Sequence, residues 1–269
     1  MRTATWAAWV CGVAALVAAC GDDKGNPTAA TPATTSISVT VNNPLKMGET
    51  AQAVGSAARS NGQSQSVTTG WKSDAPAVAT VSDAGLVTGV ANGRATVYVV
   101  ADGRQGQQVV RVVPDYHGQW VGGLRVTSCT ETGAWAQAEF CKEFPVGSTD
   151  GFTLALTQTG ESLTARPTYG PNILFTSVTS AIDSEGGAAF STTAPLSQGA
   201  VIETAWRLTS ATRGSLSGTV NEAWRLPGAP GEGRLIQNVV NAFRASTAST
   251  STSGSTKERT ERLRMRLRP

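Results

Sequence analysis

The side chains with the most distinctive chemistry in this sequence are its four cysteines. Cys11 lies inside an apolar run over residues 4–19, and Cys20 follows that run directly. A thiol at such a position can be acylated, and attached lipid chains hold a protein on a membrane. Cys129 and Cys141 lie far downstream and form an even pair, as expected for a disulfide in an oxidising compartment.

The first twenty residues have the layout of a secretory signal. Arg2 precedes an apolar stretch of ~14 residues, which is shorter than the ~20 that a membrane-spanning helix needs. The stretch ends in Leu16-Val17-Ala18-Ala19-Cys20, which resembles the bacterial lipobox. The resemblance implies a signal peptide over residues 1–19 and a Cys20 that carries diacylglyceryl and acyl (palmitate-type) groups. An ordinary signal peptide that ends in a chance cysteine is the alternative.

A polar, Thr/Ala/Pro-rich segment follows, and it predicts a flexible tether over residues 20–35. Gly21 stands where many Gram-negative lipoproteins that stay in the inner membrane have Asp. By that resemblance we expect an envelope protein that is lipid-anchored in the outer membrane. Which face of the membrane it occupies stays open.

Composition predicts an all-β protein. The 269 residues include 29 glycines, only 6% are aromatic, and short alternating segments recur between turn residues. The formal net charge of +3 is too small to name a partner, and we expect no nucleic-acid binding. The expected partners are the membrane, through the lipid, and an envelope or surface protein or glycan.

Residues 36–114 alternate apolar and polar side chains and have a turn about every ten residues, which predicts a β-sandwich. Four strings in this order resemble the group 2 bacterial Ig-like domain: Gly70-Trp71-Lys72-Ser73-Asp74, Val78-Ala79-Thr80-Val81-Ser82, Gly85-Leu86-Val87-Thr88-Gly89-Val90 and Gly93-Arg94-Ala95-Thr96-Val97. The resemblance implies an Ig-like fold found in bacterial surface proteins and adhesins, without catalysis. Trp71 is interpreted as a core residue, and a sugar- or protein-binding aromatic is the alternative.

Residues 115–269 predict a second all-β domain, a small antiparallel barrel with one short late helix. Gly118-Gln119-Trp120 resembles the start of lipocalin-like barrels, while a generic sandwich or another barrel stays open. The helical spacing of Leu235, Ile236, Val239, Val240 and Phe243 predicts a helix near residues 233–244. A Ser/Thr-rich loop is expected over residues 246–256. Strands are expected at Gly151–Thr157, Ser162–Thr168, Ile173–Ile182, Ala188–Thr193, Val201–Thr209 and Ser215–Leu226.

Near the end of the chain, Arg262, Arg264, Arg266 and Arg268 alternate with Leu263, Met265 and Leu267. A period of two is typical of a half-buried strand, so this segment is predicted to close the barrel. The alternative is a basic tail for anionic lipid or nucleic acid.

Three tryptophans of the second domain are candidate ligand-binding residues: Trp120, Trp206 and Trp224. The repeated phrases Trp206-Arg207-Leu208 and Trp224-Arg225-Leu226 would place two of them on neighbouring strands. The alternative is that tryptophans fill the core while Arg and Glu pair on the outer face.

Catalytic and metal-ligating patterns are weak. His117 is the only histidine, and no Gly-x-Ser-x-Gly nucleophile motif accompanies it. The carboxylates Asp183, Glu185, Glu203 and Glu222 are scattered along the chain, and no cluster has metal-ligand spacing. We therefore expect no enzyme, no cofactor and no metal site.

The sequence thus favours a non-catalytic envelope lipoprotein that presents an Ig-like domain and a barrel for surface binding or adhesion. A lipocalin-like carrier of a small apolar ligand is the second hypothesis, and an envelope hydrolase is the third.

Overall fold

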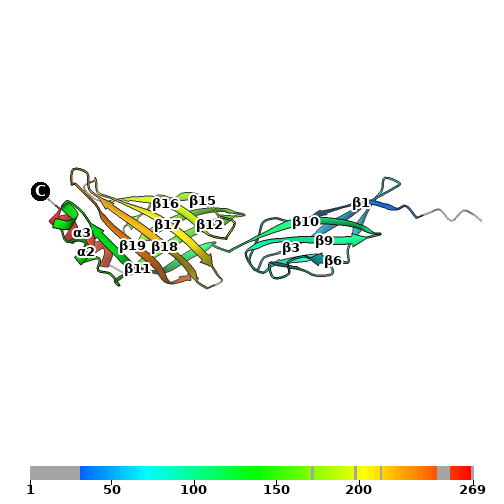
Figure 1. Ribbon diagram of the computed structural model, residues 1–269, viewed down its shortest axis with the longest axis horizontal. Helices are drawn as coiled ribbons and strands as arrows, with labels where there is room; N and C mark the ends of the chain where they lie inside the picture. The colour runs from blue at the N-terminus through cyan, green and yellow to red at the C-terminus, as the bar shows by residue number, and fades with distance from the viewer. Residues whose placement is uncertain (1–30, 171–172, 197–198, 213, 247–254, 268–269) are drawn as a thin grey trace, which may run out of the picture. The chain divides into compact units, whose positions relative to one another are not determined.

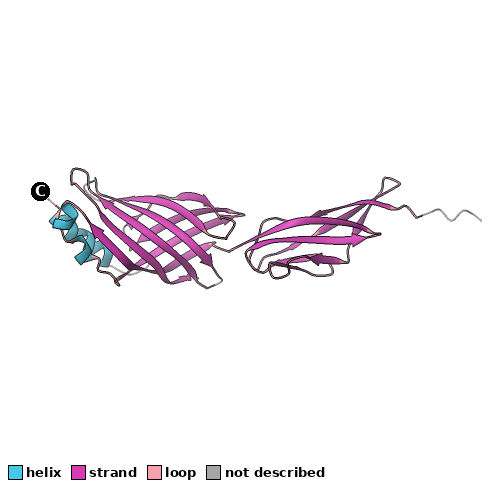
Figure 2. Ribbon diagram, in the orientation of Figure 1, coloured by secondary structure: helices cyan, strands magenta, loops and turns pink. Residues whose placement is uncertain are grey.

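The computed structural model describes residues 31–170, 173–196, 199–212, 214–246 and 255–267 (Figure 1). The signal peptide and Cys20 lie outside these ranges. Strands make up most of the described chain, as Figure 2 shows. The predicted all-β class, with an Ig-like sandwich, a barrel and one late helix, is confirmed.

The first ten strands form three small sheets. The first sheet has the order β1 (Thr34–Thr40), β4 (Val54–Arg59), β5 (Ser64–Val67). The second has the order β2 (Leu45–Lys46), β10 (Arg104–Val113), β9 (Gly93–Ala101), β6 (Trp71–Ser73). The third has the order β3 (Thr50–Gln52), β8 (Leu86–Gly89), β7 (Ala79–Val81). β1 starts at Thr34, inside the segment expected as tether.

The sequence alternation builds the core of this sandwich. On β9, Ala95, Val97 and Val99 are buried, and their neighbours along the strand point outward. Trp71 packs into the same core at 5% exposure, so the core interpretation of this residue is confirmed.

A glycine turn supports that tryptophan. Gly85 has a φ of 85°, in the left-handed region that favours glycine. A Cβ at Gly85 would lie 2.9 Å from Nε1 of Trp71, so glycine also leaves room for the indole. This turn fixes the corner between β7 and β8.

The remaining strands form one antiparallel sheet of nine strands that curls into a nearly closed barrel. They are β11 (Gly118–Glu131), β12 (Thr149–Thr159), β13 (Ser162–Tyr169), β14 (Ile173–Leu174), β15 (Val178–Ala181), β16 (Ala188–Pro195), β17 (Val201–Ala211), β18 (Leu216–Arg225) and β19 (Gly233–Arg244). The expected strand over residues 173–182 is interrupted, and it forms β14 and β15.

The barrel is an up-and-down arrangement in which the first strand meets the last. β11 pairs with β12 on one side and with β19 on the other. The seam between β13 and β16 is bridged by β14 and β15: the N–H of Thr176 donates to the carbonyl oxygen of Thr193 at 2.9 Å, and Ile182 pairs with Ala188. Few backbone groups are therefore left at an open edge.

Three helices lie at one end of the barrel (Figure 1). α1 (Ala134–Gln137) and α2 (Phe140–Glu143) lie between β11 and β12, and α3 (Ser255–Arg266) is the last described element. The predicted disulfide is confirmed: Cys129 on β11 bonds Cys141 on α2, with an S–S distance of 2.04 Å. It ties α2 to the first barrel strand.

Two predictions about the C-terminal region are wrong. Residues 233–244 form the strand β19 and not a helix. A register shift opposite β11 and the positive φ of Asn241 (50°) show an irregularity that offsets the alternation. Buried side chains therefore fall at Leu235, Gln237 and Ala242, whereas Ile236 and Phe243 of the apparent helical pattern are exposed.

Residues 262–267, the described part of the predicted closing strand, do not close the barrel, because β11 already has two neighbours. Residues 262–266 belong to α3 and Leu267 to the turn that follows it; α3 also takes up the last two residues of the loop expected over residues 246–256. Leu263 is buried and Leu267 partly buried four residues later, on the same face of the helix. The late helix is real, but it is displaced along the chain.

Candidate functional site

The three candidate tryptophans all lie inside the barrel. Trp120, Trp206 and Trp224 are at most 1% exposed. Each indole N–H donates to a neighbour: to the carbonyl oxygen of Tyr116 at 2.9 Å, to Oγ1 of Thr204 at 3.1 Å and to Oε2 of Glu222 at 3.0 Å, respectively. Their polar atoms are therefore engaged within the protein.

Other aromatic rings fill the space around these indoles. Trp206 stacks on Phe190 with centroids 5.9 Å apart, and Phe144 lies 5.3 Å from Trp224. A small apolar cavity of about 20 Å³ is left beside Trp135 and Trp224, under Leu263 of α3. The barrel interior is thus a packed core around these residues, and a ligand at the three tryptophans would have to displace it.

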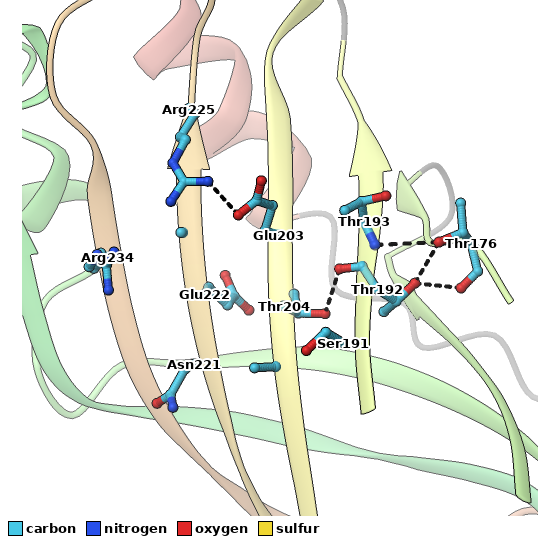
Figure 3. A pocket seen from close by; sticks show the side chains of 12 residues that line it. Thr176, Ser191, Thr192, Thr193, Glu203, Thr204, Asn221, Glu222, Arg225 and Arg234 are labelled. Carbon is cyan, nitrogen blue, oxygen red and sulfur yellow. Dashed lines mark hydrogen bonds and ion pairs between the residues drawn. The ribbon is translucent and has the colours of Figure 1, made fainter. Parts of the chain in front are cut away.

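The outer face carries a shallow groove of about 390 Å³ across β16, β17 and β18 (Figure 3). Its floor is set by register: Ala205 lies opposite Ser191 and Asn221, and Ala223 lies opposite Glu203. Short side chains at these positions leave a depression between longer ones. The groove is lined by Thr176, Ser191, Thr192, Thr193, Glu203, Thr204, Ala205, Asn221, Glu222, Ala223, Arg225 and Arg234.

Charges of both signs border one end of the groove. Nη1 of Arg225 lies 2.5 Å from Oε2 of Glu203, as Figure 3 shows, and its Nε lies 3.0 Å from Glu232. Arg234 also pairs with Glu232. Hydrogen bonds from Arg234 and Arg225 hold the pKa of Glu232 below its usual value. The predicted pairing of Arg and Glu on the outer face, with tryptophans inside, is therefore observed.

Glu203 and Glu222 come from neighbouring strands but do not form a catalytic pair. Glu203 faces outward, while the side chain of Glu222 points into the barrel and is 4% exposed. Burial raises the pKa of Glu222 to about 7; the hydrogen-bonding groups of Tyr169 and Trp224 act against this rise, and the charge of Asp150 adds to it.

The other candidate groups serve structure. The backbone N–H of exposed His117 donates to Asp115 at 3.2 Å. Asp183 accepts the N–H groups of Glu185 and Gly187, which builds a turn. Among the described residues, no group of three or more His, Cys, Asp or Glu side chains is placed to hold a metal ion. No helix in the described ranges is long and apolar enough to cross a membrane.

The C-terminal arginines pair with acidic side chains at the helical end of the barrel. Arg259 contacts Asp150, Arg262 contacts Glu143, and Arg266 contacts both Glu139 and Glu143, at 2.8 to 3.4 Å. Their charges dock α3 on the barrel. Arg268 lies outside the described residues, and the side chain of Arg264 is not described.

Neither the groove nor the arginine docking was predicted from the sequence. The groove depends on which residues of three strands lie side by side, which a single strand does not reveal. The docking had a readable signal, because Arg259, Arg262 and Arg266 have the i, i+3, i+7 spacing of one helical face.

Comparisons with curated proteins and with solved structures say little about this chain. No curated protein matches the chain. Among solved structures, domains 5–6 of the S-layer protein SbsC are 16% identical, with coverage of 77% of this chain and 98% of that chain and a TM-score of 0.28. Domains 1–6 of the surface layer protein SbsC are 11% identical, with coverage of 81% and 41% and a TM-score of 0.26. Likeness at this level defines neither the fold nor the function of this chain.

The family comparison is more informative. Residues 33–113 match the model of the bacterial Ig-like domain (group 2), and this range holds the three small sheets built around Trp71. The expected resemblance to the group 2 bacterial Ig-like domain is thus confirmed for residues 33–113, the part of the chain that holds the N-terminal sandwich.

Proposed function

We propose that this chain is a non-catalytic lipoprotein of the cell envelope, anchored through Cys20, whose barrel binds a surface or envelope protein. A surface or envelope role is supported by the bacterial Ig-like domain over residues 33–113. The Cys129–Cys141 disulfide supports an oxidising compartment. The outer membrane is the proposed location, from Gly21 after the lipobox.

The observation that carries the binding role is the outer groove. Its lining offers amide, hydroxyl, carboxylate and guanidinium groups around an alanine floor, and none of its residues is aromatic. Sugar-binding sites generally stack a ring on an aromatic side chain, whereas a polar protein segment with both charge signs needs no such platform. The groove therefore favours a protein partner over a glycan.

The anchor is tested by Cys20→Ser, with Cys11→Ser in the signal peptide as the matched control. Fractionation and palmitate labelling are the measurements. Cys20→Ser should lose the label and either leave the membrane fraction or accumulate uncleaved. Cys11→Ser should behave as the wild type. A Cys20→Ser protein that is still labelled and membrane-bound would exclude the proposed anchor.

The groove is tested by Ala205→Arg, with Ala155→Arg as the control on the outer face of β12. Purified protein is co-sedimented with isolated cell envelopes before and after the envelopes are treated with protease. Binding should be protease-sensitive, should fall at least about tenfold in Ala205→Arg, and should persist in Ala155→Arg. Binding that survives protease but not muramidase would point to a glycan, and equal binding by both variants would exclude the groove.

The two other hypotheses find less support. A carrier of an apolar ligand needs an open apolar cavity, while Trp120, Trp206 and Trp224 are packed among other rings. An envelope hydrolase needs two carboxylates in one cleft, while Glu203 and Glu222 lie on opposite faces of the sheet.

A further inference from the structure

A cluster of polar groups lies buried inside the barrel, near its helical end. Glu222 on β18, Gln237 on β19 and Tyr169 on β13 are each at most 4% exposed. They line an enclosed cavity of about 10 Å³ together with Asp150 on β12, and the apolar walls are Leu124, Phe144, Gly151 and Trp224. This volume holds about one water-sized particle.

The hydrogen bonds of this cluster do not balance. Among the described residues, Oε1 of Glu222, Oε1 of Gln237 and the hydroxyl of Tyr169 meet no partner at hydrogen-bond distance and angle, although the Tyr169 hydroxyl lies close enough to Glu222 to act on its pKa. The Oε1 atom of Gln237 can only accept a hydrogen bond, and so can Oε1 of Glu222 when the carboxylate is ionised. The hydroxyl of Tyr169 supplies a single donor. Buried polar atoms without partners are rare, because each costs about 1–3 kcal/mol. The three oxygens therefore point to a missing occupant.

The charges of the cluster do not balance either. Asp150 is paired with Arg259 of α3 at 2.8 Å. The other oxygen of Glu222 accepts only the neutral indole N–H of Trp224, at 3.0 Å. Among the described residues, no cationic side chain forms an ion pair with Glu222. The raised pKa of Glu222 is in keeping with a buried carboxylate that has no cationic partner.

We propose that Glu222, Gln237 and Tyr169, with Asp150 beside them, enclose a binding site for a single small monovalent cation, of the size of Na⁺. The donor atoms are all oxygens, which suit hard cations, whereas thiolate and imidazole ligands for transition metals are missing from the lining. Ca²⁺ takes six to eight oxygens. This cavity offers fewer, and a monovalent ion already neutralises the single negative charge of an ionised Glu222.

Glu222 also borders the outer groove, but its side chain is buried and points into the barrel, so the inference does not depend on the proposed partner. An ion held between β13, β18 and β19 would connect β13 with two strands that are not its neighbours in the sheet. Its expected effect is on barrel stability, because a ligand that binds only the folded state stabilises it by mass action.

The test is thermal unfolding of the detergent-solubilised full-length protein at constant pH and ionic strength, with NaCl replacing tetramethylammonium chloride, whose cation is too large for the cavity. At a Na⁺ concentration of ten times Kd, we expect the Tm of the barrel to rise by about 3–6 °C. Glu222→Gln should remove this shift. Glu185→Gln, which changes an exposed carboxylate in a turn, should retain it.

Direct binding is measured independently by the ²³Na NMR linewidth of the wild-type protein, which requires no variant to fold. Saturable broadening by the wild-type protein, reversed by an excess of a competing Na⁺-sized cation but not by tetramethylammonium, supports the site. Equal Tm values in the two salts, without saturable broadening, would overturn it and would assign the cavity to a water molecule beside a protonated Glu222.

Discussion

Arg259 of α3 and Asp150 of β12 form an ion pair from which most of the solvent is excluded. Nη1 lies 2.8 Å from Oδ2, and the side chains are 18% and 8% exposed. The guanidinium also lies 5.5 Å from the ring centroid of Phe144. A helix distant in sequence is thus fixed to the barrel by charge and by an aromatic face.

Replacing Arg259 by Met should destabilise the barrel by about 3 kcal/mol, because Asp150 loses its cation in a buried setting. Urea unfolding followed by tryptophan fluorescence measures the change. Arg262→Met is the control: Arg262 is 44% exposed, and Glu143 keeps its contact with Arg266 at 3.2 Å. Its cost should stay below about 1 kcal/mol. Equal costs for both variants would contradict the assigned role of Arg259.

Removing the disulfide should destabilise the barrel by roughly 3 kcal/mol, the value expected for a loop of this length. Cys129 and Cys141 are 12 residues apart, and the loop holds Trp135 and Phe140, whose rings meet edge to face at 5.5 Å. Urea unfolding of the Cys129→Ala/Cys141→Ala variant measures the loss. An unchanged midpoint would mean that packing alone holds this loop.

Gly85→Ala should destabilise the Ig-like domain by about 1–3 kcal/mol, because alanine would have to adopt a φ of 85° and approach Trp71 at 2.9 Å. Gly62→Ala separates the two causes, since Gly62 has a φ of 81° but open space around it. We expect a smaller loss there. If the two losses are equal, the contact with Trp71 contributes nothing.

The stability of the Ig-like domain should fall in acid partly through Asp102. The hydrogen bond from Thr34, followed by that from Arg59, lowers the pKa of Asp102 below 3.8. A lowered folded-state pKa means that the contribution is present above about pH 4 and is lost as the pH falls through the folded-state value. NMR titration should show the depressed pKa, and Asp102→Asn should weaken amide protection in β1 at neutral pH. A normal pKa would contradict these contacts.

The sequence was sufficient for features set by local pattern. The alternation of Ala95, Val97 and Val99 predicted β9, and the even pair of Cys129 and Cys141 in an expected oxidising compartment predicted their bond. The sequence was insufficient where the period of a strand and the period of a helix place the same residues on one face. Leu263 and Leu267 fit both a strand and a helix, and only the pairing of β11 with β19 shows that no closing strand is needed.

The candidate sites were out of reach for a related reason. Ala205, Ser191 and Asn221 become a groove floor through register, and Glu222, Gln237 and Tyr169 meet only after the barrel has formed. The sequence placed Glu222 among scattered carboxylates, because nothing local marks it as buried and without a cation.

The pairing of β11 with β19 has a consequence for how the protein is made. The first barrel strand finds its second neighbour about a hundred residues later in the chain, so this contact is of the non-local kind that slows folding. Until β19 emerges, one edge of β11 is unpaired and open to other chains. We therefore expect newly made barrels to depend on protection from aggregation until synthesis reaches Arg244, and truncation before β19 to yield insoluble protein.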